Sequence, residues 1–318
     1  MLLTSVRTPI SFQDRGNRLV GDLVLPPWEG PHPGAVFVNG YGPGGRDQGT
    51  WQERLAAAGI ASLAYDKPGC GESTGDWTRQ TLGDRTEETT RAVEVLRSRP
   101  DSSADLIVLL GAGQGGWVAL EAARVGIGVA AVVITSSSAV GSFPLEQYRL
   151  TRRMSERGFA SDEVALAQAL LRERFRRVGA GEDPLSVLAA EAACHHAPWY
   201  RLMPGATPEE ISYLARAAVF DPGPALRDLR APLLALYGCD DVFLPVEANA
   251  QHLRGILHDS GHRDFEIVLV PGADHTLRVH VGPEAPYLVD GRYQHSEVAP
   301  GVFEFIVTWL DRHLDDVD

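Results

Sequence analysis

The glycine-rich stretch LLGAGQGGW, residues 109–117, stands where a catalytic nucleophile could be held. Two leucines close an apolar strand, and Trp117 lies in the first turn of an expected helix. This strand–turn–helix context is the one that a nucleophile elbow, G-x-S-x-G, requires. Here the motif reads Gly-Ala-Gly-Gln-Gly, with Gly113 at the serine position. The sequence therefore predicts an elbow without its hydroxyl, in a strained conformation that glycine adopts at no steric cost.

A second motif overlaps the same turn. Gly111, Gly113 and Gly116 also satisfy G-x-G-x-x-G, the phosphate-binding turn of dinucleotide-binding folds. Those folds need an acidic residue at the end of the next strand for the ribose. No acidic residue occurs between Glu121 and Glu146. We therefore favour the elbow over the nucleotide site, and we expect no cofactor.

Apolar strands that alternate with helices must position this turn. A hairpin is expected over 4–13 and 18–27, strands at 34–40, 60–66, 105–111, 129–135, 231–238 and 265–272, and helices near 51–58, 81–97, 114–124, 247–257 and 301–314. Such alternation indicates an α/β fold with a mostly parallel sheet covered on both faces. The alternation stops from about 142 to 226. We therefore predict a core of residues 1–141 and 227–318, with residues 142–226 as a helical cap over the ligand-binding ends of the strands.

Further motifs follow the ends of these strands. The segment GCDDVFLP resembles the G-x-x-D-x-x-V-P turn of the α/β-hydrolase superfamily, with Asp241 as its acid, and GADH resembles the turn that carries the catalytic histidine, His275. The segment VNGYGPGG resembles the oxyanion loop, with Asn39 in place of histidine. YDKPGCGESTG resembles D-x-R-G-x-G-x-S-T-G, with Pro68 in place of arginine. The resemblance spans nearly the whole chain and implies the fold of the capped esterases and lyases of this superfamily.

The resemblance also implies a role for each matching residue. His275 would act as a base oriented by Asp241, and the backbone N–H groups of Gln114 and Tyr41 would form an oxyanion hole. Each side chain has a structural alternative: His275 could be a surface turn residue, and Asp241 could cap the helix that follows Pro245. We favour catalysis because both residues stand at the triad positions of successive strand ends.

Several other side chains are candidates for substrate binding: Asn39, Ser136, His195, Trp199 and Tyr200. The first two follow strands of the core. The other three belong to the cap, where packing within the cap is the favoured alternative. The CHH segment at 194–196 is not expected to bind a metal, because adjacent residues cannot easily face one tetrahedral ion.

The missing hydroxyl restricts the chemistry. Removing a triad serine typically lowers turnover by about 10⁶, so an ordinary acyl-enzyme esterase with this sequence would be inactive. An oriented imidazole and an oxyanion hole suit proton abstraction next to a carbonyl. With a carboxylate such as acetate on the β carbon, abstraction becomes elimination, and a serine would hydrolyse that ester first. This logic resembles that of the acyl-eliminating enzymes of tetronate-type natural-product pathways. We predict a lyase of secondary metabolism that acts on a small ester or carbonyl compound.

Other functions stay open from the sequence. The chain could be a carboxylesterase-type serine hydrolase whose nucleophile at position 113 has been replaced by glycine. It could also be a hydrolase in which His275 activates water in the space left by the serine. The third alternative is a non-catalytic small-molecule binding protein, against which the retention of Asp241 and His275 argues.

Composition narrows the partners. The 318 residues are 44% hydrophobic and 22% charged, as in ordinary globular proteins, and their net charge of −13 disfavours nucleic acids and anionic membranes as partners. Three cysteines without framework spacing suit a reducing compartment. The first ten residues lack the apolar run of a signal peptide, and no stretch reaches transmembrane length. We expect a cytoplasmic protein with a small-molecule ligand, and a homodimer stays open.

Overall fold

An eight-stranded sheet forms the centre of the computed structural model, which describes residues 5–217, 220–282, 288–289 and 292–314. The strand order is β1-β2-β4-β3-β5-β6-β7-β8. The strands are β1 (Val6–Asp14), β2 (Asn17–Leu25), β3 (His32–Val38), β4 (Ala61–Tyr65), β5 (Ser102–Ala112), β6 (Ala131–Thr135), β7 (Leu233–Gly238) and β8 (Phe265–Val270). Pairing is antiparallel from β1 to β2 and from β2 to β4, and it is parallel from β4 onward. The predicted mostly parallel α/β sheet is confirmed.

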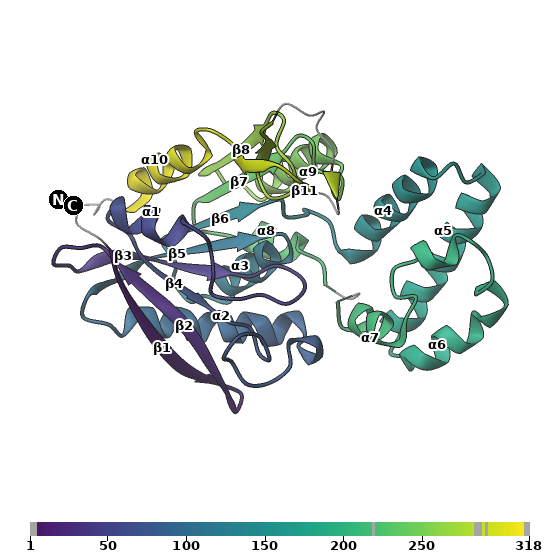
Figure 1. Cartoon of the computed structure of the whole chain (residues 1–318), viewed down its shortest axis with the longest axis horizontal. Coiled ribbons are helices and arrows are strands. Elements are labelled where there is room, and N and C mark those ends of the chain that lie inside the picture. The colour runs from purple at the N-terminus through teal and green to yellow at the C-terminus, as the bar shows by residue number, and fades with distance from the viewer. Residues whose placement is uncertain (1–4, 218–219, 283–287, 290–291, 315–318) are drawn as a thin grey trace.

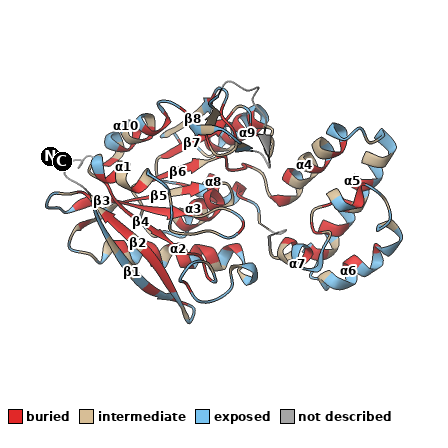
Figure 2. Ribbon diagram, in the orientation of Figure 1, coloured by how far each residue is buried: buried red, intermediate tan, exposed pale blue. Residues whose placement is uncertain are grey.

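Helices cover both faces of the sheet (Figure 1). One face packs against α1 (Trp51–Ala57) and α10 (Val302–Leu314), and the other packs against α2 (Leu82–Arg97), α3 (Gln114–Arg124), α8 (Gly223–Asp228) and α9 (Val246–Asp259). In β5, Ile107 and Leu109 pack on the face of the sheet that α2, α3, α8 and α9 cover, and Val108 packs on the face that α1 and α10 cover. This alternation follows from the two-residue period of a strand, and it leaves the central strands buried on both faces (Figure 2).

Local sequence signals explain where several elements begin. Arg15 and Gly16 connect β1 to β2 with φ values of 47° and 77°, as a type I′ hairpin turn requires. Thr81 and Asp84 form a capping box at the start of α2. Every strand and helix predicted for the core is present, with bounds that differ by at most a few residues.

A helical insertion leaves the sheet after β6. It contains α4 (Ser142–Glu156), α5 (Ser161–Gly179), α6 (Pro184–Ala190) and α7 (Pro208–Ala217), with 3₁₀ turns η2 (Ala192–Cys194) and η3 (Tyr200–Leu202). Figure 1 shows these helices grouped to one side of the sheet. They enclose an apolar cluster of their own. In contrast, α8 buries Ala225 and Leu226 against the face of the central sheet that α2, α3 and α9 also cover.

The segment between β8 and α10 contains short strands that the sequence did not predict: β9 (Arg278–His280), β10 (Leu288–Val289), β11 (Arg292–Tyr293) and β12 (Ser296–Val298). Strands of two or three residues are too short to show a period in hydrophobicity.

Among the described residues, no helix is both long enough and apolar enough to cross a bilayer.

Candidate active site

Four neighbouring strands end at the same edge of the sheet. The strands β5, β6, β7 and β8 are adjacent and parallel, so their carboxyl ends meet. The residues that follow these ends include Gly113, Ser136, Asp241 and His275, respectively. Parallel α/β sheets bind ligands at this edge. The fold thereby brings together residues that are far apart in the sequence.

His275 and Asp241 form a hydrogen-bonded pair. His275 Nδ1 lies 2.6 Å from Asp241 Oδ2, and the carboxylate is completely buried. The other carboxylate oxygen accepts a hydrogen bond from the Phe243 N–H at 2.7 Å. The Phe243 ring meets the imidazole edge-on, with centroids 5.1 Å apart. A carboxylate held in this way fixes the ring and the tautomer of the histidine, which leaves Nε2 as the nitrogen able to accept a proton.

Gly113 forms the sharp turn between β5 and α3, with φ 53° and ψ −119°. A Cβ atom added to Gly113 would meet His275 Nε2 at 3.7 Å, an ordinary van der Waals contact. Space therefore allows a side chain at this position, although the backbone conformation would be strained. The situation at Gly115 is different, because a Cβ there would lie 2.1 Å from the Val38 carbonyl oxygen. The close approach of the Val38 carbonyl therefore requires glycine at position 115, whereas space alone does not require glycine at position 113.

The two predicted oxyanion donors lie beside this turn. Gln114 is the first residue of α3, where backbone N–H groups have no partner within the helix and the helix dipole favours negative charge. Tyr41 lies in the loop after β3, and its ring packs against Trp77 and Tyr213. Both residues line the same cavity as Gly113 and His275. Donation by the two N–H groups to a substrate stays a prediction.

The cavity has a volume of about 880 Å³ and is bounded by both the core and the insertion. Leu145, Met203 and Leu214 of the insertion line it together with Gly113 and His275. Apolar walls with a few converging polar groups are typical of small-molecule sites. The cavity can therefore hold a small molecule against the imidazole.

The wall that belongs to the insertion also carries charges. Arg149 pairs with Glu146, and Arg152 pairs with Glu156, each at 2.7 Å. Arg153 stands 3.9 Å from Glu146, and burial lowers the pKa of its guanidinium. All five side chains line the cavity. A bound molecule would thus meet apolar and charged surfaces in the same cavity.

The predicted substrate-binding residues separate into two groups. Asn39 and Ser136 line the cavity, although the Asn39 amide donates to the Tyr65 carbonyl at 3.1 Å. The structure does not bring His195, Trp199 or Tyr200 to the described lining of this cavity. Trp199 and Tyr200 are buried in the core of the insertion, and the His195 ring packs against Tyr200. The rings of these three residues pack within the insertion, which is the alternative that the sequence favours.

Tyr213 and Phe243 are residues of the site that the sequence analysis missed. Tyr213 in α7 accepts a hydrogen bond from the Gln114 side chain, and burial raises its pKa to about 12. This contact joins the insertion to the elbow. No sequence signal shows which face of α7 points to the core. Phe243 could have been found, because it stands only two residues after Asp241 in the acid turn.

Ser136 combines backbone strain with an unpaired hydroxyl. Its φ is 50°, it is 3% exposed, and its Oγ has no hydrogen-bond partner within the described part of the chain. Left-handed conformations of residues other than glycine cost of order 1–3 kcal/mol and cluster at functional sites. A buried hydroxyl without a partner is also unfavourable. Ser136 also lines the cavity, so the strained turn lies at the edge of the candidate site.

We expect Ser136→Ala to raise the free energy of unfolding by about 1 kcal/mol, because it removes an unsatisfied buried hydroxyl. The matched control is Ser138→Ala, because Ser138 Oγ donates to the Val140 carbonyl at 2.9 Å. The control should lower the free energy of unfolding by about 1 kcal/mol through loss of that bond. Urea denaturation measures both values. Equal destabilisation by the two changes would show that Ser136 has a partner in the folded protein.

Comparison with known proteins supports the fold. The sequence model described as the Alpha/beta hydrolase family matches residues 35–287. A search of curated proteins finds no significant match. The solved structures that resemble the chain include DcsB bound to its substrate analogue, with TM-score 0.62 and 15% identity, covering 98% of this chain and 100% of that one. The alpha/beta hydrolase GrgF from Penicillium sp. sh18 has TM-score 0.59 and 20% identity, with coverage of 98% and 100%. A hypothetical protein from Pseudomonas aeruginosa has TM-score 0.59 and 18% identity, with coverage of 98% and 94%. At these identities the likeness shows a shared fold.

Proposed function

Because this chain belongs to the alpha/beta hydrolase family, we propose that it is an enzyme that eliminates a carboxylate from a small ester or carbonyl compound, with His275 as the base. One observation carries the proposal. Gly113 offers no nucleophile at the point where the elbow faces Nε2 of an imidazole that a buried carboxylate orients. Acyl-enzyme catalysis requires a nucleophile there. Proton abstraction from carbon requires only the base and a way to stabilise the enolate.

The proposed reaction starts with transfer of a proton from the carbon next to the carbonyl to His275 Nε2. The electron pair passes into the enolate, whose oxygen accepts hydrogen bonds from the N–H groups of Gln114 and Tyr41. Collapse of the enolate forms a carbon–carbon double bond, and the C–O bond on the β carbon breaks with its electron pair going to the carboxylate. Asp241 stabilises the imidazolium that holds the proton. After the carboxylate has left, Nε2 releases this proton to solvent, which regenerates the neutral base. Water is not consumed.

The family assignment favours a second candidate, which is hydrolysis by a water molecule. Nε2 would then remove a proton from water held in the space beside Gly113, and the water would attack the acyl carbon. The two candidates use the same residues and break different bonds. Elimination breaks the C–O bond on the alkyl side, whereas hydrolysis breaks it on the acyl side.

We propose that residues 142–226 act as a cap over the core of residues 1–141 and 227–318. Support comes from the cavity, whose wall includes Leu145, Met203 and Leu214 of the insertion. The Gln114–Tyr213 hydrogen bond supplies a contact through which the cap can adjust to a ligand. A cap that excludes water would protect an enolate from protonation by solvent.

Product analysis tests the proposed reaction. The probe 4-acetoxy-2-butanone has an acidic proton next to a ketone and an acetate on the β carbon. Elimination yields methyl vinyl ketone and acetate, whereas hydrolysis yields 4-hydroxy-2-butanone and acetate. Proton NMR distinguishes these products during turnover. We expect methyl vinyl ketone above the rate seen with His275→Ala, and exclusive formation of 4-hydroxy-2-butanone would select the second candidate.

A further inference from the structure

Lys67 is the only lysine of the chain, and its side chain is buried behind the loop that contains Tyr41. Its Nζ donates hydrogen bonds to the carbonyl oxygens of Gly42, at 2.7 Å, and Gly40, at 3.3 Å. The ammonium also lies over the Trp77 ring, 4.7 Å from the centroid. Within the described residues, no carboxylate forms an ion pair with Lys67. A buried ammonium without a counter-ion is unfavourable, so its presence here calls for a function.

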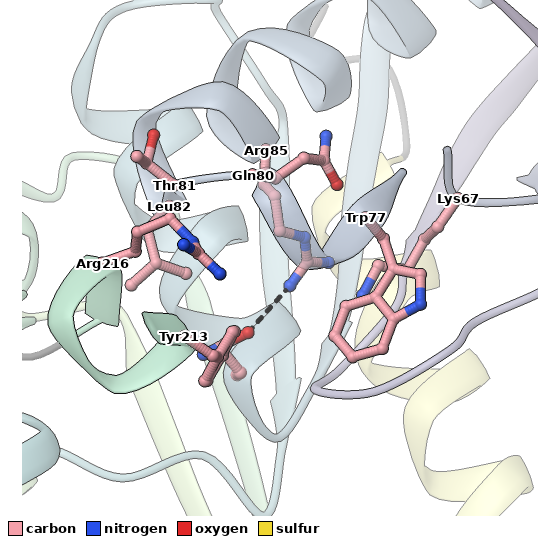
Figure 3. A pocket seen from close by; sticks show the side chains of 9 residues that line it. Lys67, Trp77, Gln80, Thr81, Leu82, Arg85, Tyr213 and Arg216 are labelled. Atoms are coloured by element: carbon pink, nitrogen blue, oxygen red, sulfur yellow. Dashed lines mark hydrogen bonds between the residues drawn. The ribbon is translucent and has the colours of Figure 1, made fainter. Parts of the chain in front are cut away.

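Arg85 in α2 contacts the same loop and is also buried. Its guanidinium donates to the carbonyl oxygens of Asn39 and Gly40, the latter at 3.4 Å. It also donates to Gln114 Oε1 at 3.2 Å. Figure 3 shows the Arg85 guanidinium between Trp77 and Tyr213, with the Lys67 chain beside Trp77. Two buried cations therefore hold the carbonyl groups on either side of Tyr41.

The geometry of one peptide bond gives these contacts a consequence. The Gly40–Tyr41 peptide is trans, so the Gly40 C=O and the Tyr41 N–H point in opposite directions. Both cations contact the Gly40 oxygen, which fixes the direction of the Tyr41 N–H on the other side of the peptide plane. Hydrogen bonds to a carbonyl also polarise the peptide and strengthen its N–H as a donor. Tyr41 itself lines the large cavity that contains His275.

We propose that Lys67, together with Arg85, is a positioning residue that orients and polarises the Gly40–Tyr41 peptide so that its N–H stabilises negative charge on a substrate oxygen. This inference rests on the proposed oxyanion role of Tyr41. It adds to that role two positive charges that contact the carbonyl side of the donating peptide, in a site where position 113 is glycine. The ammonium does not touch the substrate and acts through the peptide.

Lys67 and Arg85, with their contacts to the Gly40–Tyr41 peptide, are called the clamp below. The burial of Lys67 makes this clamp sensitive to pH. Desolvation, reinforced by the charge of Arg85, lowers the pKa of Lys67 to about 7. The other titratable groups around it are Glu88 on α2, Tyr213 and Arg216 on α7, and Cys70 on its own loop. Because the protonated amine is the stronger donor, turnover should fall as pH rises through about 7.

The free energy of unfolding should rise with pH over the range in which turnover falls. The pKa of Lys67 is lower in the folded protein than the ordinary lysine value of 10.5 that applies to the unfolded chain. Between about 7 and 10.5 the unfolded chain therefore binds more protons at this site, so the free energy of unfolding rises with pH. A lysine with only a structural role would not link falling turnover to rising stability.

NMR of the unaltered protein tests the clamp without any substrate. Lysine labelled with ¹³C gives a single side-chain signal, because Lys67 is the only lysine. Glycine labelled at its carbonyl carbon and tyrosine labelled with ¹⁵N give one correlated amide signal, because Gly40–Tyr41 is the only Gly-Tyr pair in the chain. We expect the lysine signal to titrate near pH 7 and the Tyr41 amide signal to shift with the same midpoint. A Tyr41 amide that does not respond while the lysine titrates would overturn the proposal.

Lys67→Met, which keeps the length of the side chain and removes its charge, tests the consequence for turnover. On 4-acetoxy-2-butanone at pH 6, we expect kcat to fall by about 10²-fold, as for other losses of oxyanion stabilisation, with little change in KM. The decline of kcat above pH 7 should disappear in this variant. The control Arg79→Met removes an exposed positive charge near Trp77 and should leave kcat and its pH profile unchanged.

The NMR titration and the kinetics of Lys67→Met test separate parts of the proposal, so either one can reject its part alone. Should Lys67→Met not fold, the NMR titration of the unaltered protein still decides whether the clamp exists. A Tyr41 signal that follows Lys67 in a protein that does not turn over the probe would reject the proposed reaction and retain the clamp. Equal effects of Lys67→Met and Arg79→Met on kcat would reject the contribution of Lys67 to catalysis.

Discussion

His275→Ala is expected to lower turnover by about 10⁴-fold, the upper range for loss of a general base. The imidazole is the only side chain that the proposed reaction uses to remove the proton, so no other group can replace it. Substrate affinity should change little, because the cavity walls stay intact. Initial rates and KM, measured for His275→Ala with 4-acetoxy-2-butanone, check both expectations. Turnover within tenfold of the unaltered enzyme would remove His275 from the mechanism.

Asp241→Asn should lower kcat by a similar factor of about 10⁴, because an asparagine side chain can hold the wrong tautomer of the histidine. The neighbouring Asp240→Asn provides a matched control in the same turn. Asp240 accepts a hydrogen bond from the Tyr293 hydroxyl and does not contact His275 in the described structure. A larger loss for Asp240→Asn than for Asp241→Asn would mean that the wrong acid of this pair has been assigned.

Gly113→Ser is expected to change the reaction rather than abolish it. A serine at this position would place its Cβ 3.7 Å from His275 Nε2, so its hydroxyl could reach the imidazole. We expect the variant to attack the acetyl group and hydrolyse p-nitrophenyl acetate with a burst of p-nitrophenol, the sign of an acyl-enzyme. The left-handed backbone should also lower the free energy of unfolding by about 1–3 kcal/mol.

The matched control is Gly113→Ala, which introduces the same backbone strain without a hydroxyl. It should lose a similar amount of stability and show no burst. The comparison separates the effect of the nucleophile from the effect of the side chain. If serine and alanine variants hydrolyse p-nitrophenyl acetate at the same rate, position 113 does not face His275 in the way that the structure indicates.

The core of the fold could be predicted because its signals are local and repeated. Apolar strands and amphipathic helices alternate over most of the chain, and glycine and proline mark the turns between them. The motifs around Asp241 and His275 stand directly after strands, so parallel pairing brings them to one edge. Gly113 could be located for the same reason, since its turn lies between β5 and α3.

Other parts of the site depend on contacts that no local pattern encodes. Trp199 and Tyr200 were candidates for substrate binding, with packing within the cap as the favoured alternative, and both are buried within the insertion. Which face of each helix in the insertion points to the core depends on packing between elements. The strain and the unpaired hydroxyl of Ser136 are likewise features of the folded chain. Lys67 is the single lysine of the sequence, and its contacts with the loop appear only in the folded chain.

Turnover of 4-acetoxy-2-butanone in ¹⁸O-labelled water tests the central claim most directly, with mass spectrometry of the released acetate as the readout. Elimination breaks the C–O bond on the alkyl side, so acetate keeps both of its original oxygen atoms. Gly113→Ser serves as the positive control, because hydrolysis of its acyl-enzyme puts one solvent oxygen into acetate. The account predicts unlabelled acetate from the unaltered protein and labelled acetate from the control. Labelled acetate from the unaltered protein would contradict the elimination and establish hydrolysis in its place.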